Sequence, residues 1–418
     1  MVKRLVLLLF IAGSVPLLAQ KKCSMESYVQ QELKADPLLQ NKLNEIDVFT
    51  QSRSFVNDQT QRTVNQLPEL IKIPVVVHVL YHTPDENVSL AVIKNMISAL
   101  NRDFVKKNTD TSKIPAHFKH LAVNMGFEFK LATMDPNGNG TGGVVRKYTP
   151  LKFWMSDDKM KFNSSYGDDG WDSKNYLNIW ICNMIDVLGY STFPGMDAKK
   201  DGIVIAVENF QNGRGTTPGI NDGRTVVHEV GHWLNLMHIW GDGYCGDDKV
   251  NDTPKQSTYT PGCPTGNRVS CNNGPFGDMY MNYMDFTDDQ CMSMFTKGQK
   301  ARARAVFESG GPRNSILSST GLDVSNTQAA DLPEYYPQWL YAHVYPNPAT
   351  SVVNVFFEYD ERWIGKEIQV IDLTGKVVIR KVINGKIHSI DVSRLNSGVY
   401  FIRAEKDQEK IRAKFVKQ

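Results

Sequence analysis

The sequence predicts an α/β or α+β domain followed by a small all-β sandwich, and three observations support this. Up to about residue 327, apolar β-branched runs alternate with runs of helical spacing. Prolines then mark a linker. Short alternating segments with turn residues between them fill the remainder. At 418 residues the chain is too long for one compact core, so more than one domain is expected.

The individual elements follow from these patterns. Apolar runs rich in β-branched residues predict buried strands at residues 71–81, 127–132, 177–185 and 202–207. Apolar residues at helical spacing predict helices at 89–105 and 225–236. In the sandwich, strands are expected at 352–357, 367–372, 376–380, 388–392, 398–404 and 411–416.

The N-terminus has the pattern of a secretory signal peptide. Lys3 and Arg4 precede a short apolar run, and small or apolar residues continue to Ala19. Neither this run nor any later one reaches the roughly 20 apolar residues that a membrane span needs. We therefore expect a signal peptide at 1–19, a polar prosegment at 20–52, the main domain at 53–326, and linker plus sandwich at 327–418.

Composition excludes some partners, and the cysteines indicate the compartment. A formal net charge of +2 gives no indication of nucleic-acid or anionic membrane binding. Of six cysteines, four cluster just after the histidine motif described below, whereas Cys23 and Cys182 stand apart. In an exported chain the cluster predicts two local disulfides, with three possible pairings.

The main chemical signal is the run from His228 to His238. On a helix, His228 and His232 lie one turn apart on one face and can hold one metal ion. Glu229 beside them is placed to take a proton from a metal-bound water rather than to ligate. His238 reaches the same ion only if the helix ends first, and Asn235 tolerates the left-handed turn required.

These residues predict a catalytic zinc site that hydrolyses peptide bonds. Three histidines leave a fourth position open for water, whose pKa zinc lowers toward about 7. Glu229 would take the proton during attack and pass it to the leaving amine. The alternative is a secreted binding or adhesion protein with structural zinc, but such sites usually have a closed, Cys-rich shell of four ligands.

With these residues identified, the chain resembles the metzincins and, within them, the pappalysin family. HEVGHWLNLMH, from His228 to His238, resembles the family's extended zinc motif, with Asn235 in place of the usual Gly. Met284, within Met-Asn-Tyr-Met-Asp-Phe, resembles its Met-turn residue. The resemblance covers about residues 71–318. It implies an α+β catalytic domain of two subdomains, with a twisted sheet and an active-site helix.

The resemblance also implies how substrate binds. Residues 189–193 correspond to the edge strand that pairs with substrate backbone in metzincins, which predicts an endopeptidase acting on extended segments. Phe286 stands where relatives usually have a tyrosine that stabilises the reaction intermediate. A catalytically weakened enzyme is therefore a second possibility.

Further residues gain roles only from this resemblance. It implies disulfides Cys245–Cys271 and Cys263–Cys291. It also implies a structural calcium ion in the loop after the zinc motif, where hard oxygen ligands are available. The expected calcium ligands are Asp248, Asn251 and Thr253. The alternative for this loop is an acidic, solvated surface.

The resemblance also implies which substrates are preferred and how the precursor is kept inactive. Asp289, five residues after Met284, matches an acid at the base of the S1′ pocket, which implies a preference for Arg or Lys after the cut. Asp288 is the adjacent alternative, and a surface acid is another.

Cys23 in the prosegment corresponds to a cysteine switch that ligates zinc in the latent form, rather than a stray thiol. Ser52–Arg53 is the expected bond for self-cleavage.

The C-terminal segment resembles the sorting domain of the type IX secretion system. Its marks are VYPNPA at 344–349, VIDLTGK at 370–376 and LNSGVYFI at 395–402. This implies a Gram-negative bacterial protein, secreted or held at the cell surface, with the secretion machinery as partner. A carbohydrate-binding or adhesive sandwich is the alternative.

The remaining histidines lack ligand spacing and are expected to be structural or exposed: His78, His82, His117, His120, His343 and His388.

Overall fold

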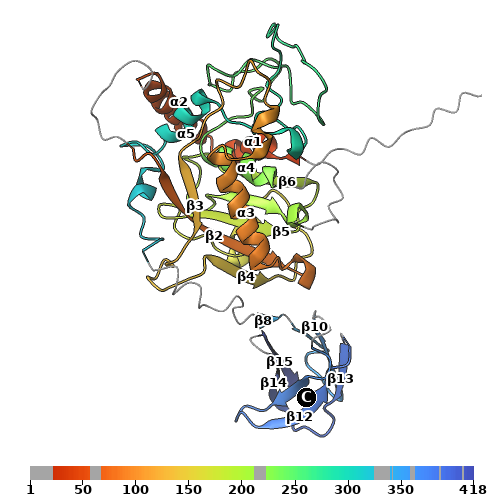
Figure 1. The fold of residues 1–418 in the computed structure, drawn as a ribbon. Coiled ribbons are helices and arrows are strands. Elements are labelled where there is room, and N and C mark those ends of the chain that lie inside the picture. Colours follow the sequence, from red (N-terminus) through yellow and green to blue (C-terminus); the bar gives the residue numbers. More distant parts are fainter. Residues whose placement is uncertain are drawn as a thin grey trace, which may run out of the picture.

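A computed structural model describes residues 22–56, 67–210, 223–323, 339–340, 342–357, 363–385, 387–406 and 409–418. The predicted signal peptide at 1–19 lies outside the described residues. The described chain forms two N-terminal helices, a mixed domain of helices and sheet, and an all-β domain (Figure 1). The α+β class is therefore confirmed.

The centre of the mixed domain is a seven-stranded sheet with the order β1-β6-β7-β5-β2-β3, in which β4 also pairs with β2. Its longest strand, β2, is buried at every position except Lys72. The predicted strands are present, while β4 was not predicted. The bounds are β1 Lys22–Cys23, β2 Ile71–Tyr81, β3 Phe127–Leu131, β4 Val144–Tyr148, β5 Leu177–Cys182, β6 Val187–Ser191 and β7 Ile203–Ala206.

The edge of this sheet is where the prosegment meets the main domain. Strands β2, β3, β4, β5 and β7 are parallel, and β6 runs antiparallel to β7. β1 then adds to β6 in parallel, with Cys23 opposite Gly189. The backbone groups of the edge strand are thereby paired with the prosegment.

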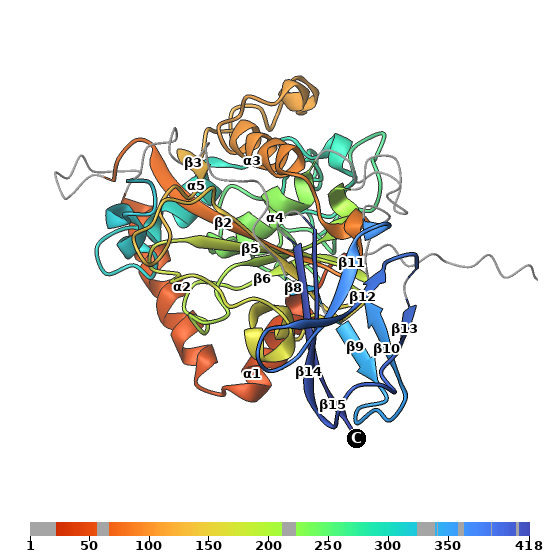
Figure 2. The same cartoon turned by 90° about the horizontal axis from the view of Figure 1, so that it is seen from below.

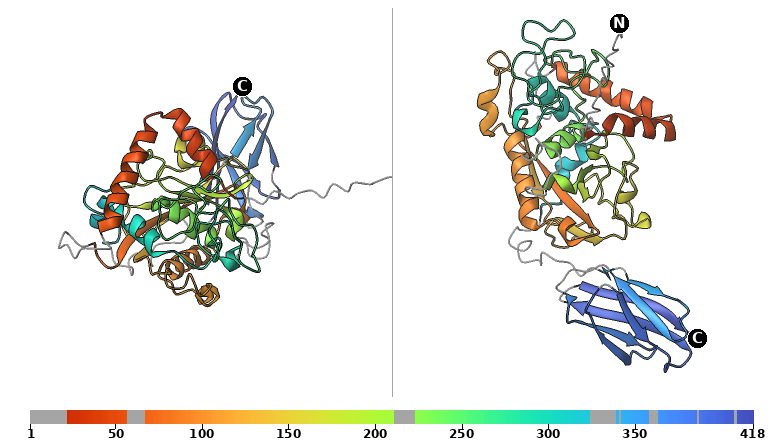
Figure 3. Two further views of the ribbon diagram at one scale, coloured as in Figure 1. Left: turned by 90° about the horizontal axis from the view of Figure 1, so that it is seen from above. Right: turned by 90° about the vertical axis from the view of Figure 1, so that its right-hand side faces the viewer.

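Different helices cover the two faces of the sheet, because side chains alternate along each strand. α3 (Leu90–Phe104) and α4 (Arg224–Trp233) share one core with the strands. α1 (Met25–Ala35) of the prosegment covers the other face, where Met25 and Tyr28 are buried. α2 (Leu39–Val56) packs against α5 (Lys297–Ala305) on the outside (Figure 3).

A buried ion pair holds the C-terminal end of α4. Arg313 donates to the backbone oxygen of Trp233 at 2.7 Å and to both carboxylate oxygens of Asp201 at 2.9 and 3.0 Å. Its guanidinium also lies 3.6 Å from the centroid of the Trp233 ring. Breaking a buried pair of this kind typically costs about 3–5 kcal/mol, so the end of the helix is firmly placed.

After α4 the chain has little regular structure and is held by two disulfides. Cys245 bonds to Cys271 and Cys263 to Cys291, with Cα–Cα separations of 5.7 and 5.8 Å. These are the pairings that the resemblance implied. Short 3₁₀ helices lie at Pro84–Glu86, Thr109–Lys113, Lys159–Lys161, Asn163–Ser165, Val207–Phe210, Asp289–Cys291 and Asn314–Ser318.

The C-terminal domain is a sandwich of two sheets with its own core, antiparallel except where β8 pairs with β15 in parallel. One sheet has the order β13-β10-β9 and the other β12-β11-β14-β15-β8 (Figure 2). All six predicted strands are present, and β8 and β9 are additional. The bounds are β8 Trp339–Leu340, β9 Ala342–Tyr345, β10 Val352–Phe357, β11 Glu367–Ile371, β12 Val377–Val382, β13 Ile387–Asp391, β14 Gly398–Lys406 and β15 Glu409–Lys417.

None of the helices within the described residues combines the length and the hydrophobicity of a membrane span.

Candidate active site

The turn after α4 brings the third histidine back to the first two. α4 ends at Trp233, and Asn235 follows with φ at +71°, in the left-handed region. The backbone N–H of Leu236 donates to the carbonyl of Gly231 at 2.9 Å, which closes the turn. The helix therefore ends between His232 and His238, at Trp233 and so three residues before the predicted end at 236, and Asn235 is the left-handed residue that the sequence indicated.

The three imidazoles converge through their Nε2 atoms. Nε2 of His232 lies 3.1 Å from Nε2 of His228 and 3.1 Å from Nε2 of His238. On the other side of each ring, Nδ1 faces an oxygen: the carbonyl of Tyr283 at 2.7 Å, the carbonyl of Leu236 at 2.8 Å, and the carboxylate of Asp242. Each Nδ1 therefore carries the hydrogen, and each Nε2 offers its lone pair to one point.

The environment keeps these rings in the form that binds metal. Burial lowers the pKa of His228 to about 3 and that of His232 well below its ordinary value, so both are neutral near pH 7. Asp242 orients His238 from one side, and the Trp240 ring stacks on it at 4.3 Å. Sequence reasoning missed these two residues, because an Asp and a Trp shortly after a histidine have no diagnostic spacing.

Glu229 lies beside the histidines with an unused carboxylate. It is fully buried, and neither oxygen has a hydrogen-bond partner among the described residues. Burial raises the pKa of Glu229 to about 8, an effect that the neighbouring Cys23 thiol partly offsets. Gly189 of the edge strand makes room for it: a Cβ there would lie 3.1 Å from both Cγ and Oε1 of Glu229.

Met284 lies directly beneath the motif helix. It is fully buried, and a Cβ on Gly231 would collide with its sulfur. The glycine within the histidine motif therefore allows the Met-turn to approach. The turn is held by Asp285, whose carboxylate accepts from the backbone N–H groups of Thr260 and Phe286, each at 2.7 Å, and from Nε2 of Gln256 at 2.9 Å.

Cys23 lies at the same point as the histidines. Its Sγ and the ligand nitrogens of the three histidines all lie within 4.8 Å of one another. The prosegment is placed there by β1 and by a hydrogen bond from the backbone N–H of Ser24 to the Gly189 carbonyl at 3.1 Å. Three nitrogens and one sulfur fit a tetrahedral zinc ion. Across the described chain, no second cluster of His, Cys, Asp or Glu meets this test.

Phe286 forms an apolar wall beside the histidines. Its ring centroid lies 5.4 Å from that of His228, 4.9 Å from that of His238 and 4.8 Å from that of Trp240. The side chain has no hydroxyl group to offer a reaction intermediate, so the departure noted in the sequence lies directly at the site.

The structure brings together two of the three expected calcium ligands. Thr253 Oγ1 donates to both carboxylate oxygens of Asp248 at 2.9 Å. Asp248 is buried, which raises its pKa to about 7. Asn251 is exposed, and no described contact joins it to them. The next carboxylate, Asp252, instead accepts from Thr296 and Gly298 at the start of α5.

Asp289 lies at the N-terminus of the motif helix. Its side chain is buried, and Oδ2 accepts a hydrogen bond from the backbone N–H of Arg224 at 3.1 Å. The guanidinium of Arg224 pairs with Asp103 and Asp110 at 3.0 and 2.9 Å. Asp288 is the N-cap residue just before the 3₁₀ helix that begins at Asp289, and it is only partly buried.

Three other histidines are buried and have partners within the protein. His78 bonds through Nδ1 to Asp168 at 2.7 Å. His82 and His388 face the carbonyls of Thr149 and Gly385. His117, His120 and His343 likewise lie outside the metal cluster.

Two family models match the chain. Residues 161–308 match the model described as pregnancy-associated plasma protein-A. Residues 343–418 match the secretion system C-terminal sorting domain, which marks the chain as a secreted or cell-surface protein.

Fungal extracellular metalloproteases are similar to the first of these regions. The chain is 42% identical over 143 residues to one from Pyricularia oryzae, which covers 31% of this chain and 48% of that protein. It is 31% identical over 217 residues to one from Neurospora crassa, covering 47% and 75%. The chain thus spans about half the length of the first of these relatives.

Two solved structures from Tannerella forsythia are also similar. Mature mirolysin in complex with a cleaved peptide is 44% identical, with a TM-score of 0.58, and the match covers 60% of this chain and 97% of that one. A promirolysin mutant is 38% identical, with a TM-score of 0.63, and covers 71% and 97%. The likeness therefore confirms the metzincin-type fold.

Replacement of Asp285 tests the role of its carboxylate in holding the Met-turn. Burial raises the pKa of Asp285 to about 6 from an ordinary 3.8, so the folded state binds the proton more tightly than the unfolded state does. Between about pH 4 and pH 6 this residue therefore lowers stability as pH rises, by at most ~1.4 kcal/mol per pH unit. Asp285→Asn should remove this dependence of stability on pH, while its side-chain oxygen can still accept hydrogen bonds.

Asp285→Ala serves as the matched variant, because it leaves buried donors unpaired and should cost about 1–3 kcal/mol or more at every pH. Urea unfolding between pH 4 and pH 7 measures both effects. If the stability of the Asn variant kept the same dependence on pH, that dependence could not be assigned to Asp285.

Proposed function

Because the chain belongs to the pappalysin family of metallopeptidases, we propose that it is a secreted zinc-dependent endopeptidase made as a latent precursor. One observation carries the proposal: three imidazoles direct their Nε2 atoms to one point, and the buried Glu229 carboxylate lies beside it.

Each residue has a defined task in peptide hydrolysis. Zinc held by His228, His232 and His238 would activate a water molecule and polarise the peptide carbonyl. Glu229 accepts the proton of the attacking water and then donates it to the leaving nitrogen. The buried carboxylate supports this role, because the Cys23 thiol that lies beside it would leave with the prosegment.

The edge strand β6 supports an endopeptidase. In the precursor its Gly189 carbonyl accepts from the Ser24 backbone, so this strand can pair with an extended chain. After release of the prosegment, a substrate segment would take its place by adding a strand to the sheet. Such pairing reads main-chain groups and does not require a chain end.

A weakened enzyme, or a non-catalytic zinc-binding or adhesion protein, is the second candidate, and Phe286 is the observation that favours it. With no hydroxyl there, the intermediate loses a donor that relatives usually provide. The loss of one such donor typically lowers kcat about 10²–10³-fold. We favour the active enzyme because the zinc ligands and Glu229 are complete.

We infer that Asp289 sets a preference for Arg or Lys at P1′. Its carboxylate is buried at the N-terminus of α4, the helix that carries His228 and His232. The Arg224 guanidinium is engaged with Asp103 and Asp110. A cationic substrate side chain would form a charge-assisted hydrogen bond with this acid.

Latency is proposed to depend on Cys23 as the fourth zinc ligand. Its thiolate would fill the position that water needs. The rest of the prosegment holds it there: Tyr28 donates to Asp158 at 2.9 Å in a buried site, and Glu32 pairs with Lys200 at 2.8 Å. The greater coverage by promirolysin than by mature mirolysin, 71% against 60%, supports a precursor.

Activation would then require the prosegment to be cut. The proposed boundary places residues 20–52 before the cut and the catalytic domain from 53 onward. The Ser52–Arg53 bond lies inside α2, and Arg53 pairs with Glu308 at 3.2 Å. Because a peptidase cleft takes an extended segment, the last turns of α2 must unfold locally before this bond is cut.

Calcium and the secretion machinery are the remaining proposed partners. Asp248 and Thr253 are joined in a buried pair, which suits a hard oxygen site. Asn251 would have to turn inward to complete the calcium site.

We propose that the type IX secretion machinery recognises the sorting domain at 343–418.

The catalytic base is tested with the activated chain and its Glu229→Ala variant. The activated chain should cut a quenched peptide with one internal Arg, and a chelator should abolish cleavage. The variant should lose about 10²–10⁴-fold or more in kcat while still binding zinc. Fluorescence and zinc analysis measure both quantities. Equal rates for the two proteins would contradict the role of Glu229.

The switch is tested in the uncut precursor. Cys23→Ala should give activity without cleavage of the prosegment, because the fourth zinc position is then open. Cys182→Ala is the matched control, since that thiol is buried beside Met184 and away from the histidines. Latency that survives in the Cys23 variant would mean that helix packing alone blocks the cleft.

The S1′ assignment is tested with peptides that differ only in the residue after the cut. Asp289→Asn should lower kcat/KM for Arg at that place by roughly 10–100-fold, from the loss of a charge-assisted hydrogen bond. Cleavage before an uncharged residue should change little. An Arg preference that persists in the variant would move the assignment to Asp288.

Calcium binding is tested by thermal unfolding of the zinc-loaded precursor. Calcium should raise the Tm of the wild type, and Asp248→Asn should abolish the rise. Asp247→Asn is the control, because that neighbouring carboxylate is half exposed and bonds only to Lys249 among the contacts described. A calcium response that both variants keep would place the ion elsewhere.

A further inference from the structure

We propose that Arg302 and Asn235 form a carboxylate-binding subsite beside the zinc histidines. In the precursor Asp47 of the prosegment fills it, and in the activated enzyme an acidic side chain of the peptide substrate fills it. The substrate class rests on the proposed peptidase function, whereas the binding site itself rests on the geometry of Arg302.

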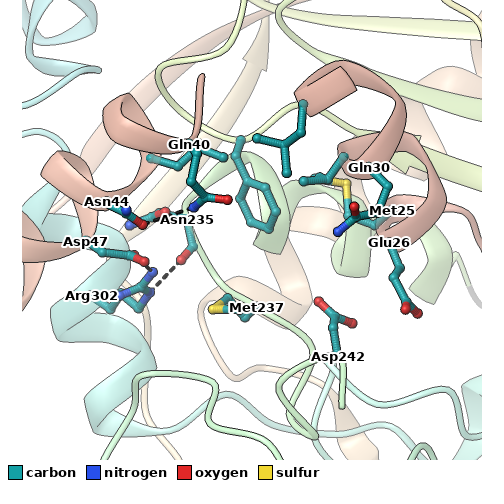
Figure 4. Close-up of a pocket in the computed structure, with 14 residues that line it drawn as sticks. Met25, Glu26, Gln30, Gln40, Asn44, Asp47, Asn235, Met237, Asp242 and Arg302 are labelled. Carbon is teal, nitrogen blue, oxygen red and sulfur yellow. Dashed lines mark hydrogen bonds and ion pairs between the residues drawn. The ribbon is translucent and has the colours of Figure 1, made fainter. Parts of the chain in front are cut away.

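The guanidinium of Arg302 lies between the cleft and the prosegment. Arg302 is only 2% exposed. Its Nε donates to the Asn235 carbonyl at 2.6 Å. Its other two nitrogens face α2: Nη1 donates to Thr50 Oγ1 at 3.5 Å, and Nη2 to the Asp47 carboxylate (Figure 4).

Release of the prosegment changes this balance of charge. Of the three groups that accept hydrogen bonds from Arg302, the Asp47 and Thr50 side chains leave with the prosegment, and the Asn235 carbonyl stays. A recessed guanidinium without a counter-ion is unfavourable, and its planar fork suits a carboxylate. Asp248 also acts electrostatically on Arg302, but its carboxylate is occupied by Thr253 and Val250.

The subsite opens into a cavity next to the zinc ligands. Between the prosegment helices and the cleft lies a cavity with a catalytic-domain wall of Phe193, Asn235, Met237, Asp242 and Arg302. The Phe193 ring lies 5.6 Å from that of His232, and Asp242 bonds to His238. A peptide that reaches the zinc along β6 therefore passes this cavity.

The two charged groups of this wall are separated. Figure 4 shows Arg302 and Asp242 on opposite sides of the cavity, with Met237 between them. The carboxylate of Asp242 is engaged with His238, so a substrate acid at Arg302 meets a cation without lying against a second free acid. One position of the substrate should therefore favour Asp or Glu, in addition to the Arg or Lys at P1′ that Asp289 is proposed to bind.

The experiment uses the chain activated by removal of its prosegment. Peptides with one internal Arg carry either Asp or Asn at one position at a time on both sides of the cut. We expect kcat/KM to be about 10-fold or more higher for Asp at one position, as for a hydrogen bond between charged groups. Arg302→Met should bring the ratio of kcat/KM between the Asp and Asn peptides close to one, whatever its absolute rates become.

A binding measurement separates this inference from the peptidase function. The Glu229→Ala variant binds the same labelled peptides without cutting them, and fluorescence anisotropy should show the same Asp preference. If Asp and Asn peptides bind and are cut equally at every position, the subsite is wrong although the peptidase function stands. If no peptide is cut but the Asp peptide binds more tightly, the peptidase function fails and the subsite stands.

The substrate series needs no mutation, so it decides the matter even if Arg302→Met does not fold. In a folded variant, an Asp preference that persists would assign the site to another cation and overturn the proposal.

Discussion

The left-handed turn at Asn235 is the constraint on which the rest of the site depends. A continuous helix would carry His238 to another face, whereas the turn returns it to within 3.1 Å of His232. The turn is supported from three sides: by closure onto Gly231, by Arg302 bonding to the Asn235 carbonyl, and by Arg313 holding the preceding end of α4. Asn is able to replace the usual Gly because its side chain tolerates this backbone conformation.

The same turn would couple the proposed catalysis to the proposed latency. Arg302 supports it from the catalytic domain and simultaneously pairs with Asp47 of the prosegment. The prosegment thus contacts the zinc site twice, through Cys23 at the metal position and through α2 behind the turn. Its β1 strand also occupies the edge of β6. Removal of one segment would therefore open the metal, the pairing edge and the proposed acidic subsite together.

The sequence predicted the parts of the structure that are encoded locally. β2 appears at its predicted bounds because its apolar residues are mostly β-branched and favour a buried strand, and the histidine motif is recognisable by spacing alone. β4 was missed because Arg146 and Lys147 break its apolar pattern. Tyr28 and Asp158 are 130 residues apart, and Asp47 and Arg302 are 255 apart, so no local pattern joins them. The unused carboxylate of Glu229 and the space at Gly189 likewise appear only in three dimensions.

X-ray absorption at the zinc edge, on the zinc-loaded precursor and on the activated chain, tests the central claim most directly. We expect three nitrogen ligands at about 2.0–2.1 Å and one sulfur at about 2.3 Å in the precursor, with the sulfur replaced by a light atom after activation. A precursor spectrum without sulfur would contradict the role of Cys23. Fewer than three histidine nitrogens in either state would contradict the site built by the turn at Asn235.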